Sequence, residues 1–169
     1  MEIVVPAGAL VLLVGPSGSG KSTFARRHFR VSEILSSDAF RAMVADDEDD
    51  QAASRPAFEV LHLVAARRLA RGRLSVVDAT NLGRAARRTL LGMAAAFRRP
   101  ALALVFDLPL ELLLAYNGQR PGRVVRREVI EEQLRRLEAT LPLLPREGYA
   151  AVHVLRSPAE VEAAVVRRA

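Results

Sequence analysis

The chain has 169 residues, about the size of one domain, and its 50% hydrophobic and 26% charged content excludes a mostly disordered, collagen-like or coiled-coil protein. Cysteine is absent, which excludes a disulfide scaffold, a zinc–thiolate site and a cysteine nucleophile; with no signal-peptide pattern and no apolar run that could span a bilayer, we expect a cytoplasmic protein. The formal net charge of +6 favours polyanionic partners such as nucleic acid, nucleotides or anionic membranes, although a basic composition also serves solubility alone.

Apolar runs bounded by turn residues predict strands, and segments with helical spacing lie between them. The predicted strands, in chain order, are residues 10–14, 34–36, 74–77, 102–106 and 152–155, with residues 3–5 as a short extra strand that turns back at residues 6–8. The predicted helices begin at Lys21 and near Pro56 and cover residues 84–97, 110–117, 127–141 and 158–167. This alternation predicts an α/β fold whose central, mostly parallel sheet is covered by helices on both faces. Ligands of such sheets bind beyond the carboxyl ends of the strands.

The loop after the strand at residues 10–14 matches the phosphate-binding pattern G-x-x-x-x-G-K-[ST]. Glycines let backbone N–H groups converge on phosphate oxygens, and the following helix directs its positive end at the same place. Lys21, the only lysine in the sequence, is placed to reach the β- and γ-phosphates, and the Ser22 hydroxyl to bind Mg²⁺. The predicted ATP-binding residues are Gly15, Pro16, Ser17, Gly18, Ser19, Gly20, Lys21, Ser22 and Thr23.

A carboxylate follows the strand at residues 34–36. Asp38 can orient an acceptor hydroxyl and take its proton during phosphoryl transfer. Arg41 lies one helical turn further on the same side, where it can hold a phosphate of the acceptor. A purely structural alternative is that Ser37 or Asp38 caps the next helix.

A second carboxylate ends the strand at residues 74–77. Asp78 at such a position supports the Mg²⁺ site of P-loop proteins, and Asn81 could reach the acceptor. The alternative is again a helix cap, because Thr80 and Asn81 precede a helical segment.

Arginines gather after the helix at residues 110–117. Pro121 and Gly122 break that helix, and Arg120 and Arg123 could stabilise the charge on the transferring phosphoryl group from a lid. The alternative is a solvated basic connector.

Taken in order, these motifs resemble one family, the 5′-kinase domain of the bacterial polynucleotide kinase-phosphatase RNA-repair enzymes, kin to phage polynucleotide kinase. The resemblance rests on the P-loop, Ser-Ser-Asp38-x-x-Arg41, the acidic run at residues 46–50 with Gln51, Val-Asp78-Ala-Thr-Asn81, Arg120-x-x-Arg123, residues 146–149 and residues 157–158. It spans nearly the whole chain and implies one P-loop polynucleotide kinase domain over residues 1–169.

The resemblance also implies a role for each matching residue. Lys21 and Ser22 would bind ATP and Mg²⁺, and Asp38 would be the general base for a polynucleotide 5′-OH. Arg41 would grip the phosphate backbone of the acceptor, and Gln51 would lie near the acceptor strand. Arg120 and Arg123 would form the lid over ATP.

The sequence departs from the family at Tyr116, where an arginine usually stands, and tyrosine cannot supply that charge. The phosphatase and adenylyltransferase of full-length members have no counterpart here, because a Gly-Asp phosphoesterase signature is missing and the single lysine serves the P-loop. Such phosphatase and ligase activities would belong to domains or partners outside this chain.

The prediction is therefore ATP-dependent phosphorylation of the 5′-OH end of RNA or DNA, with nucleic-acid ends as partners. A P-loop kinase that acts on a small-molecule hydroxyl shares every residue on the ATP side and is the first alternative. A non-catalytic, nucleotide-dependent switch is the second alternative, and it has no use for a carboxylate at Asp38.

Overall fold

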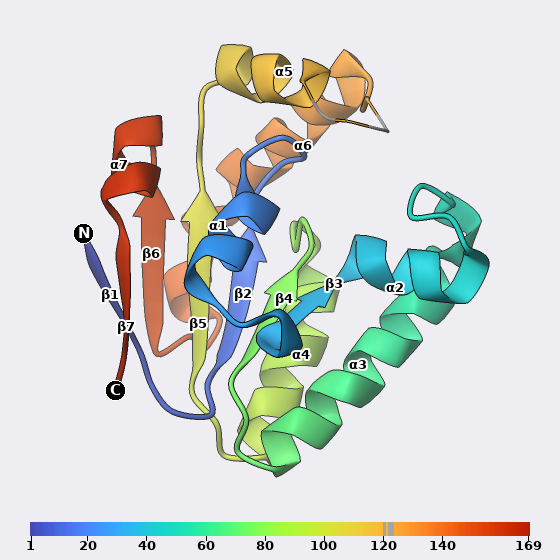
Figure 1. Ribbon diagram of the computed structural model, residues 1–169. Coiled ribbons are helices and arrows are strands. Elements are labelled where there is room, and N and C mark those ends of the chain that lie inside the picture. The colour runs from blue at the N-terminus through green and yellow to red at the C-terminus, as the bar shows by residue number, and fades with distance from the viewer. Residues whose placement is uncertain (120, 122–123) are drawn as a thin grey trace.

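A computed structural model describes residues 1–119, 121 and 124–169. Its helices are α1 (Lys21–His28), α2 (Ser37–Ala45), α3 (Ser54–Ala70), α4 (Arg84–Ala96), α5 (Leu110–Gly118), α6 (Arg127–Thr140) and α7 (Pro158–Ala163) (Figure 1). Its strands are β1 (Glu2–Val5), β2 (Leu10–Val14), β3 (Ile34–Ser36), β4 (Ser75–Asp78), β5 (Ala101–Phe106), β6 (Ala151–Leu155) and β7 (Val165–Arg168). Three short 3₁₀ turns complete the described part: η1 (Val31–Glu33), η2 (Gln51–Ala53) and η3 (Leu144–Arg146).

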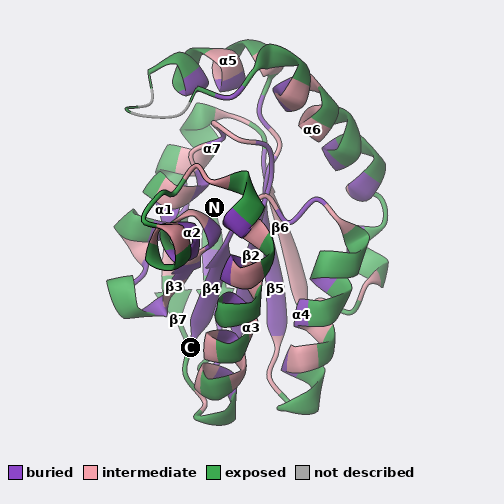
Figure 2. Ribbon diagram, turned by 90° about the vertical axis from the view of Figure 1, so that its right-hand side faces the viewer, coloured by how far each residue is buried: buried purple, intermediate pink, exposed green. Residues whose placement is uncertain are grey.

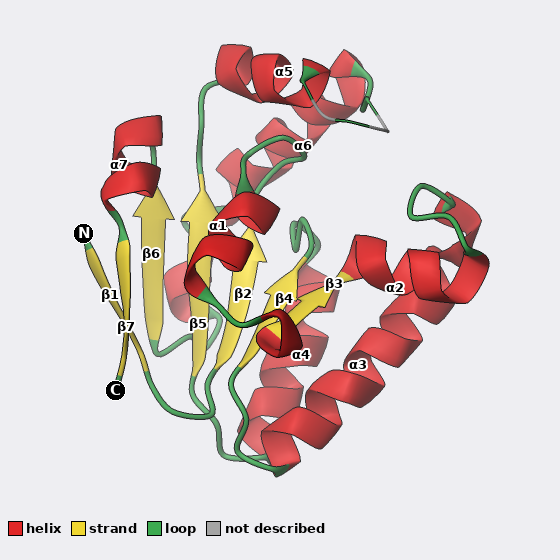
Figure 3. Cartoon of the chain, viewed as in Figure 1, coloured by secondary structure: helices red, strands yellow, loops and turns green. Residues whose placement is uncertain are grey.

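The central sheet is parallel throughout and has the strand order β3-β4-β2-β5-β6 (Figure 3). β2 lies in its middle, where Leu12 is paired with Val77 of β4 and with Ala103 of β5. All five residues of β2 are buried, as expected for a strand covered on both faces. The predicted α/β class is therefore confirmed.

Side chains of β2 alternate between two hydrophobic cores. Leu10, Leu12 and Val14 face the core covered by α3, α4 and α6, whereas Val11 and Leu13 face the core covered by α1, β1 and α7. Figure 2 shows β2, β4 and β5 as the buried centre of the molecule, with exposed residues on the outer sides of the helices. α5 lies beyond the carboxyl ends of the strands, on the side of the P-loop (Figure 1).

Near the chain termini, one prediction is confirmed and one differs from the structure. The short strand predicted at residues 3–5 is β1, and the chain turns at residues 6–8 as expected; β1 pairs with β7, and together they form a separate two-stranded parallel sheet. The predicted helix at residues 158–167 was too long, because α7 ends at Ala163 and residues 165–168 are β7. The β-branched Val165 and Val166 favour a strand, and β1 provides the partner that the local pattern could not reveal.

The helix predicted near Pro56 begins two residues earlier, at Ser54. Its buried stripe is Ala57, Leu61, Ala65 and Leu69, each four residues apart, and Phe58 packs against the same core from a half-buried position. In the described part of the chain, the helices are all too short or too polar to traverse a lipid bilayer.

Candidate active site

The P-loop connects the carboxyl end of β2 to the first residue of α1, as its motif predicts. Gly18 has a left-handed φ of 80°, and a Cβ there would lie 2.8 Å from the carbonyl oxygen of Leu113. A side chain at Gly18 would therefore collide with α5, so the glycine is required both by the turn and by close packing.

Lys21 is buried at the start of α1, with 7% of its surface exposed. Its Nζ donates hydrogen bonds to the carbonyl oxygen of Pro16 at 2.6 Å and to Ser19 Oγ at 3.1 Å. The Lys21 side chain thus folds back over the P-loop, and its ammonium lies among the backbone groups that would surround a phosphate chain.

The carboxyl ends of three adjacent strands bring the predicted acidic residues together. Asp78 at the end of β4 is paired in register with Leu13 of β2 and with Ser36 of β3, two residues before Asp38. The side chain of Ser22 makes a hydrogen bond to Asp78, and the charges of Lys21 and Asp38 act on the same carboxylate. Residues far apart in the sequence therefore form one polar cluster at the carboxyl ends of the strands.

Burial raises the pKa of Asp78 above its ordinary value, since only 6% of this residue is exposed. The hydrogen bond from Ser22 and the charge of Lys21 act in the opposite direction, while the negative charge of Asp38 adds to the rise in pKa. The ionised form of Asp78 therefore costs folding free energy, which is typical of a group kept for chemistry rather than for stability.

Asp38 and Arg41 lie in the first turns of α2 and contact each other directly. An Nη of Arg41 donates to Asp38 Oδ1, and Arg41 Nε donates to the carbonyl oxygen of Glu48 at 2.8 Å. The Asp38 side chain is 41% exposed, whereas that of Arg41 is 10% exposed. The helix cap is Ser36, whose Oγ accepts from the backbone N–H of Ala39, so neither Ser37 nor Asp38 has the capping role.

Arg41 therefore orients the Asp38 carboxylate and links it to the acidic loop at residues 46–50. This contact fixes the Asp38 carboxylate while 41% of the side chain stays exposed, which suits a group that must meet an incoming hydroxyl. The arrangement agrees with the predicted placement of both residues on one side of the helix, while their roles toward an acceptor stay predictions.

Asn81 is buried and has an αL backbone conformation, with φ of 50°. Its Nδ2 donates to the carbonyl oxygen of Leu13 at 2.7 Å, which ties the loop after β4 to the end of β2. The cap of α4 is Gly83, so the alternative in which Thr80 or Asn81 caps that helix does not apply. A role of Asn81 in acceptor binding stays a prediction.

The remaining predicted residues lie around this cluster or outside the described part. Gln51 is exposed in η2, where its Nε2 donates to the carbonyl oxygen of Asp49 at 3.2 Å, and Thr23 is exposed on α1. Tyr116 is 37% exposed on α5. Arg120 and Arg123 lie outside the described residues, so the predicted lid is not placed.

Three side chains that the sequence reading missed support the P-loop and its neighbours. Gln133 of α6 accepts a hydrogen bond from the backbone N–H of Ser17 at 2.8 Å. Asn117 of α5 exchanges two hydrogen bonds with the backbone of Val125, at 2.7 and 2.9 Å, and so closes the segment between α5 and α6 at its base. Gln133 stands in no motif, because its contact depends on helix packing.

Arg87 is the third, and it is almost completely buried in α4, with 1% exposed. It donates to the carbonyl oxygens of Asn81 and Leu82 at 3.1 and 2.8 Å and pairs with Glu147 through two hydrogen bonds of 2.7 and 2.8 Å. Arg87 thereby fixes the backbone of the loop after β4. A glutamate 60 residues away gives no local signal of this pairing.

The oxygen atoms of Ser22 and Asp78 fit Mg²⁺, a hard cation that prefers oxygen ligands and retains several waters. No group of three or more histidine, aspartate or glutamate residues that could hold a metal exists in the described ranges. A magnesium ion bound with ATP needs only a few protein ligands, because phosphate oxygens supply others. The residues are therefore compatible with the predicted magnesium site.

Comparison with solved structures shows the same fold in several proteins, one of them a sugar kinase. The chain is 25% identical to a protein in the Pnkp1/Rnl/Hen1 RNA repair complex, with a TM-score of 0.70 over 82% of this chain and 46% of that one. It is 22% identical to a sugar kinase from Janibacter sp. HTCC2649, with a TM-score of 0.60 over 91% and 90% of the two chains. It is 19% identical to Chaetomium thermophilum Kti12 in complex with ADP-AlF3, with a TM-score of 0.65 over 90% and 93%.

This chain therefore spans about half the length of the RNA repair protein that it resembles. No curated protein matches the sequence at a significant level. The family model described as AAA domain matches residues 10–144, which is well over half of the chain and includes the P-loop, Asp38 and Asp78. The chain belongs to this AAA domain family and has the fold of a nucleotide-binding P-loop kinase.

Proposed function

We propose that this chain transfers the γ-phosphate of ATP to the 5′-hydroxyl of an RNA or DNA strand. The observation that carries the proposal is the Asp38–Arg41 pair beside the P-loop cluster of Lys21, Ser22 and Asp78. A partly exposed carboxylate at this edge is suited to a hydroxyl that arrives at the end of a long molecule.

In this reaction the acceptor oxygen attacks the γ-phosphorus in line with the bond to the β-phosphate, which breaks and releases ADP. Asp38 accepts the proton of the hydroxyl, and Arg41 holds the Asp38 carboxylate in the orientation that receives it. Lys21 and the backbone N–H groups of the P-loop bind the phosphate chain. Ser22, with support from Asp78, would hold Mg²⁺, which would neutralise phosphate charge.

Two observations support a polynucleotide acceptor. The chain carries a net charge of +6 although five acidic residues are concentrated at residues 46–50. It is also 25% identical to a protein of an RNA repair complex over 82% of its length. Within this proposal Arg120 and Arg123 stabilise the transferring phosphoryl group, Gln51 and Asn81 border the acceptor, and phosphatase and ligase activities reside in other domains or partners.

A small-molecule acceptor is the second candidate. It is favoured by the similarity to a sugar kinase, which extends over 91% of this chain and 90% of that one. Every residue on the ATP side would act in the same way, so only the acceptor distinguishes the two functions.

The test is an assay with ATP, Mg²⁺ and a 5′-OH oligonucleotide in RNA and DNA forms, with sugars as parallel acceptors and product mass as the readout. We expect one phosphate to be added to the oligonucleotide and none to the sugars. Asp38→Ala should lower the rate by about 10²–10⁴-fold, the usual contribution of a general base. Glu59→Ala, which removes an exposed carboxylate of α3, is the matched control and should retain the wild-type rate.

Phosphate transfer to a sugar but not to either oligonucleotide would establish the second candidate instead. Equal rates for wild-type protein and Asp38→Ala would remove Asp38 from the reaction.

A further inference from the structure

A basic surface lies at the amino ends of the strands of the central sheet, opposite the end that carries the P-loop. A pocket of about 810 Å³ is bordered by η1, the C-terminal end of α3, the turn before β4, and the ends of β1 and β7. Gly8 and Leu74 place it at the amino ends of β2 and β4, whereas the P-loop follows the carboxyl end of β2. The pocket is therefore separate from the candidate active site. Its volume is in the range of ligand-binding pockets, about 300–1,000 Å³.

The side chains that line this pocket are strongly basic. The charged ones are Arg30, Glu33, Arg67, Arg68, Arg71, Arg73 and Arg168. Six arginines thus face a single glutamate, although the chain as a whole has 19 acidic residues to 25 basic ones. Such a local excess of guanidinium groups attracts anions and is costly to leave without counter-charges.

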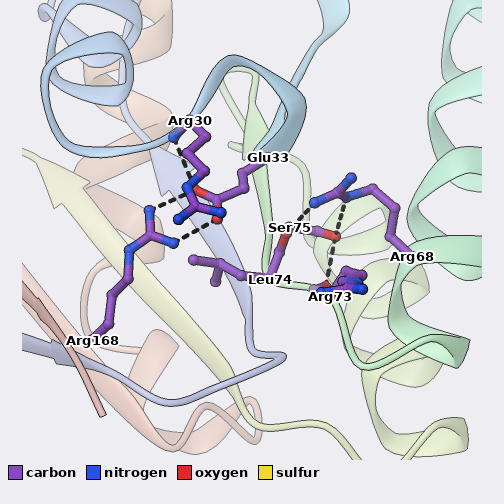
Figure 4. Close-up of polar contacts among 7 residues, drawn as sticks. All are labelled: Arg30, Glu33, Arg68, Arg73, Leu74, Ser75 and Arg168. Carbon is purple, nitrogen blue, oxygen red and sulfur yellow. Dashed lines mark hydrogen bonds and ion pairs between the residues drawn. The ribbon is translucent and has the colours of Figure 1, made fainter.

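Two of the arginines are held by the protein and form the walls (Figure 4). Arg168 donates to both carboxylate oxygens of Glu33 at 2.6 and 2.7 Å, and Glu33 also accepts from the backbone N–H of Arg30. Arg68 donates to the carbonyl oxygen of Leu74 at 2.7 Å and to Ser75 Oγ at 3.2 Å. These contacts fix β7 to η1 and α3 to β4.

The floor between the walls is also rigid. Gly8 has a left-handed φ of 68°, and a Cβ there would lie only 2.9 Å from the carbonyl oxygen of Gly72. The two turns therefore pack backbone against backbone, which leaves no space for a side chain between them. The pocket is preorganised by packing and hydrogen bonds.

Three other arginines remain available to a ligand. Arg67, Arg71 and Arg73 are exposed, and within the described ranges their guanidinium groups have no hydrogen-bond or ion-pair partner. Guanidinium groups bind phosphate oxygens in a bidentate manner. The three side chains come from the end of α3 and the following turn, so they line one rim and can contact successive phosphates.

We propose that this pocket binds the phosphodiester backbone of the acceptor strand at a distance from its 5′ end. This inference rests on the proposed function. α3 connects the two places, because its first residue follows the acidic loop near Arg41 and its last turn lines the pocket. Its 17 residues span about 25 Å at 1.5 Å per residue. A stacked strand rises about 3.4 Å per nucleotide, so about seven nucleotides cover that length.

The test compares long and short acceptors in the triple variant Arg67→Ala, Arg71→Ala, Arg73→Ala. For a 5′-OH strand of about 20 nucleotides, we expect KM to rise at least tenfold and the salt dependence of binding to weaken by about two in slope, at roughly 0.7 per lost phosphate contact. For a 5′-OH trinucleotide, which cannot reach the pocket, KM and kcat should be unchanged. The KM for ATP should also be unchanged.

The matched control removes three arginines of α4 and η3 that line a different surface: Arg84→Ala, Arg88→Ala, Arg146→Ala. It lowers the net charge by the same amount, so a general electrostatic effect would appear in both variants. The melting temperature of neither triple variant should fall below that of the wild type, because the arginines replaced at the basic pocket have no partner among the described residues and their removal relieves repulsion between like charges.

An unchanged KM for the long acceptor overturns the inference, and so does an equal rise of KM for the trinucleotide. Fluorescence anisotropy with the long strand and no ATP separates the two proposals. If the wild-type protein binds the strand through these arginines but phosphorylates no oligonucleotide, the proposed function fails and the pocket inference stands. If inorganic tripolyphosphate binds through the same arginines as tightly as the long strand, the site belongs to small anions and the inference fails.

Discussion

Among single residues, Asp78 shows most clearly how the candidate site trades stability for chemistry. Its carboxylate lies in a buried position where desolvation opposes the charge, and the hydrogen bond from Ser22 and the charge of Lys21 offset that cost only in part. A residue selected for stability alone would not be ionised here. We therefore expect the ionised Asp78 carboxylate to become favourable when the magnesium ion of ATP is bound.

Replacing Asp78 with asparagine should stabilise the nucleotide-free protein and abolish activity. Because the folded-state pKa of Asp78 is raised, its ionisation costs stability once the pH exceeds the unfolded value of about 3.9. Each kcal/mol of this cost that is removed raises Tm by about 2–4 °C for a chain of this size. The check is a pair of thermal melts at pH 7 and pH 3: the gain should be present at pH 7 and lost at pH 3, where the carboxyl is protonated in the folded and the unfolded state. A lower Tm for Asp78→Asn at pH 7 would contradict this reading.

At the level of elements, the ion pair between Arg87 and Glu147 holds the loop that carries Asn81. It joins α4 to the segment between η3 and β6, and both side chains are buried, with 1% and 9% exposed. Breaking one half of such a pair leaves an uncompensated charge in the interior. We therefore expect the loss of one partner to cost more stability than the net attraction of the intact pair provides.

Arg87→Met should destabilise the fold by about 3–5 kcal/mol, because Glu147 then lacks its partner in a buried position. Urea denaturation followed by circular dichroism measures this change. The double variant Arg87→Met, Glu147→Met should recover most of the lost stability, since it removes both charges together. A double variant as unstable as the single one would show that specific hydrogen bonds to Asn81 and Leu82, rather than charge burial, carry the stability.

Across the whole molecule, the sequence predicted the central sheet and the P-loop better than the elements near the chain termini. Five strands and the P-loop could be predicted because each is a local pattern, and parallel strands necessarily bring Asp38 and Asp78 to the same edge. β7 was predicted as helix, since only its pairing with β1 makes residues 165–168 a strand. Gln133 and Arg87 were missed because their partners are 116 and 60 residues away.

The long-range pairing of β7 predicts a specific weakness to acid. Burial alone would raise the pKa of Glu33, but the hydrogen bonds and charges of Arg168 and Arg30 outweigh it and lower the pKa. The stabilisation is therefore present above the unfolded pKa of about 4.3 and is lost as the pH falls through the folded pKa. Glu33→Gln should cost about 1.5–3 kcal/mol at pH 7, the range for hydrogen bonds to charged groups.

Denaturation curves at pH 7 and pH 3 check this prediction. The wild-type protein should lose more stability than Glu33→Gln between these two values, because the variant has no carboxylate to protonate at this position. Equal losses in the two proteins would place the acid sensitivity elsewhere.

The proposed reaction is tested most directly by single-turnover transfer of the ATP γ-phosphate to a 5′-OH oligonucleotide by wild-type protein and by Asp38→Asn. This variant keeps the size of the side chain but cannot accept the proton. We expect transfer by the wild type, a rate at least about 10²-fold lower in the variant, and equal ATP binding by both. Transfer at the same rate in both proteins, or ATP binding with no transfer by the wild type, would contradict the proposed function.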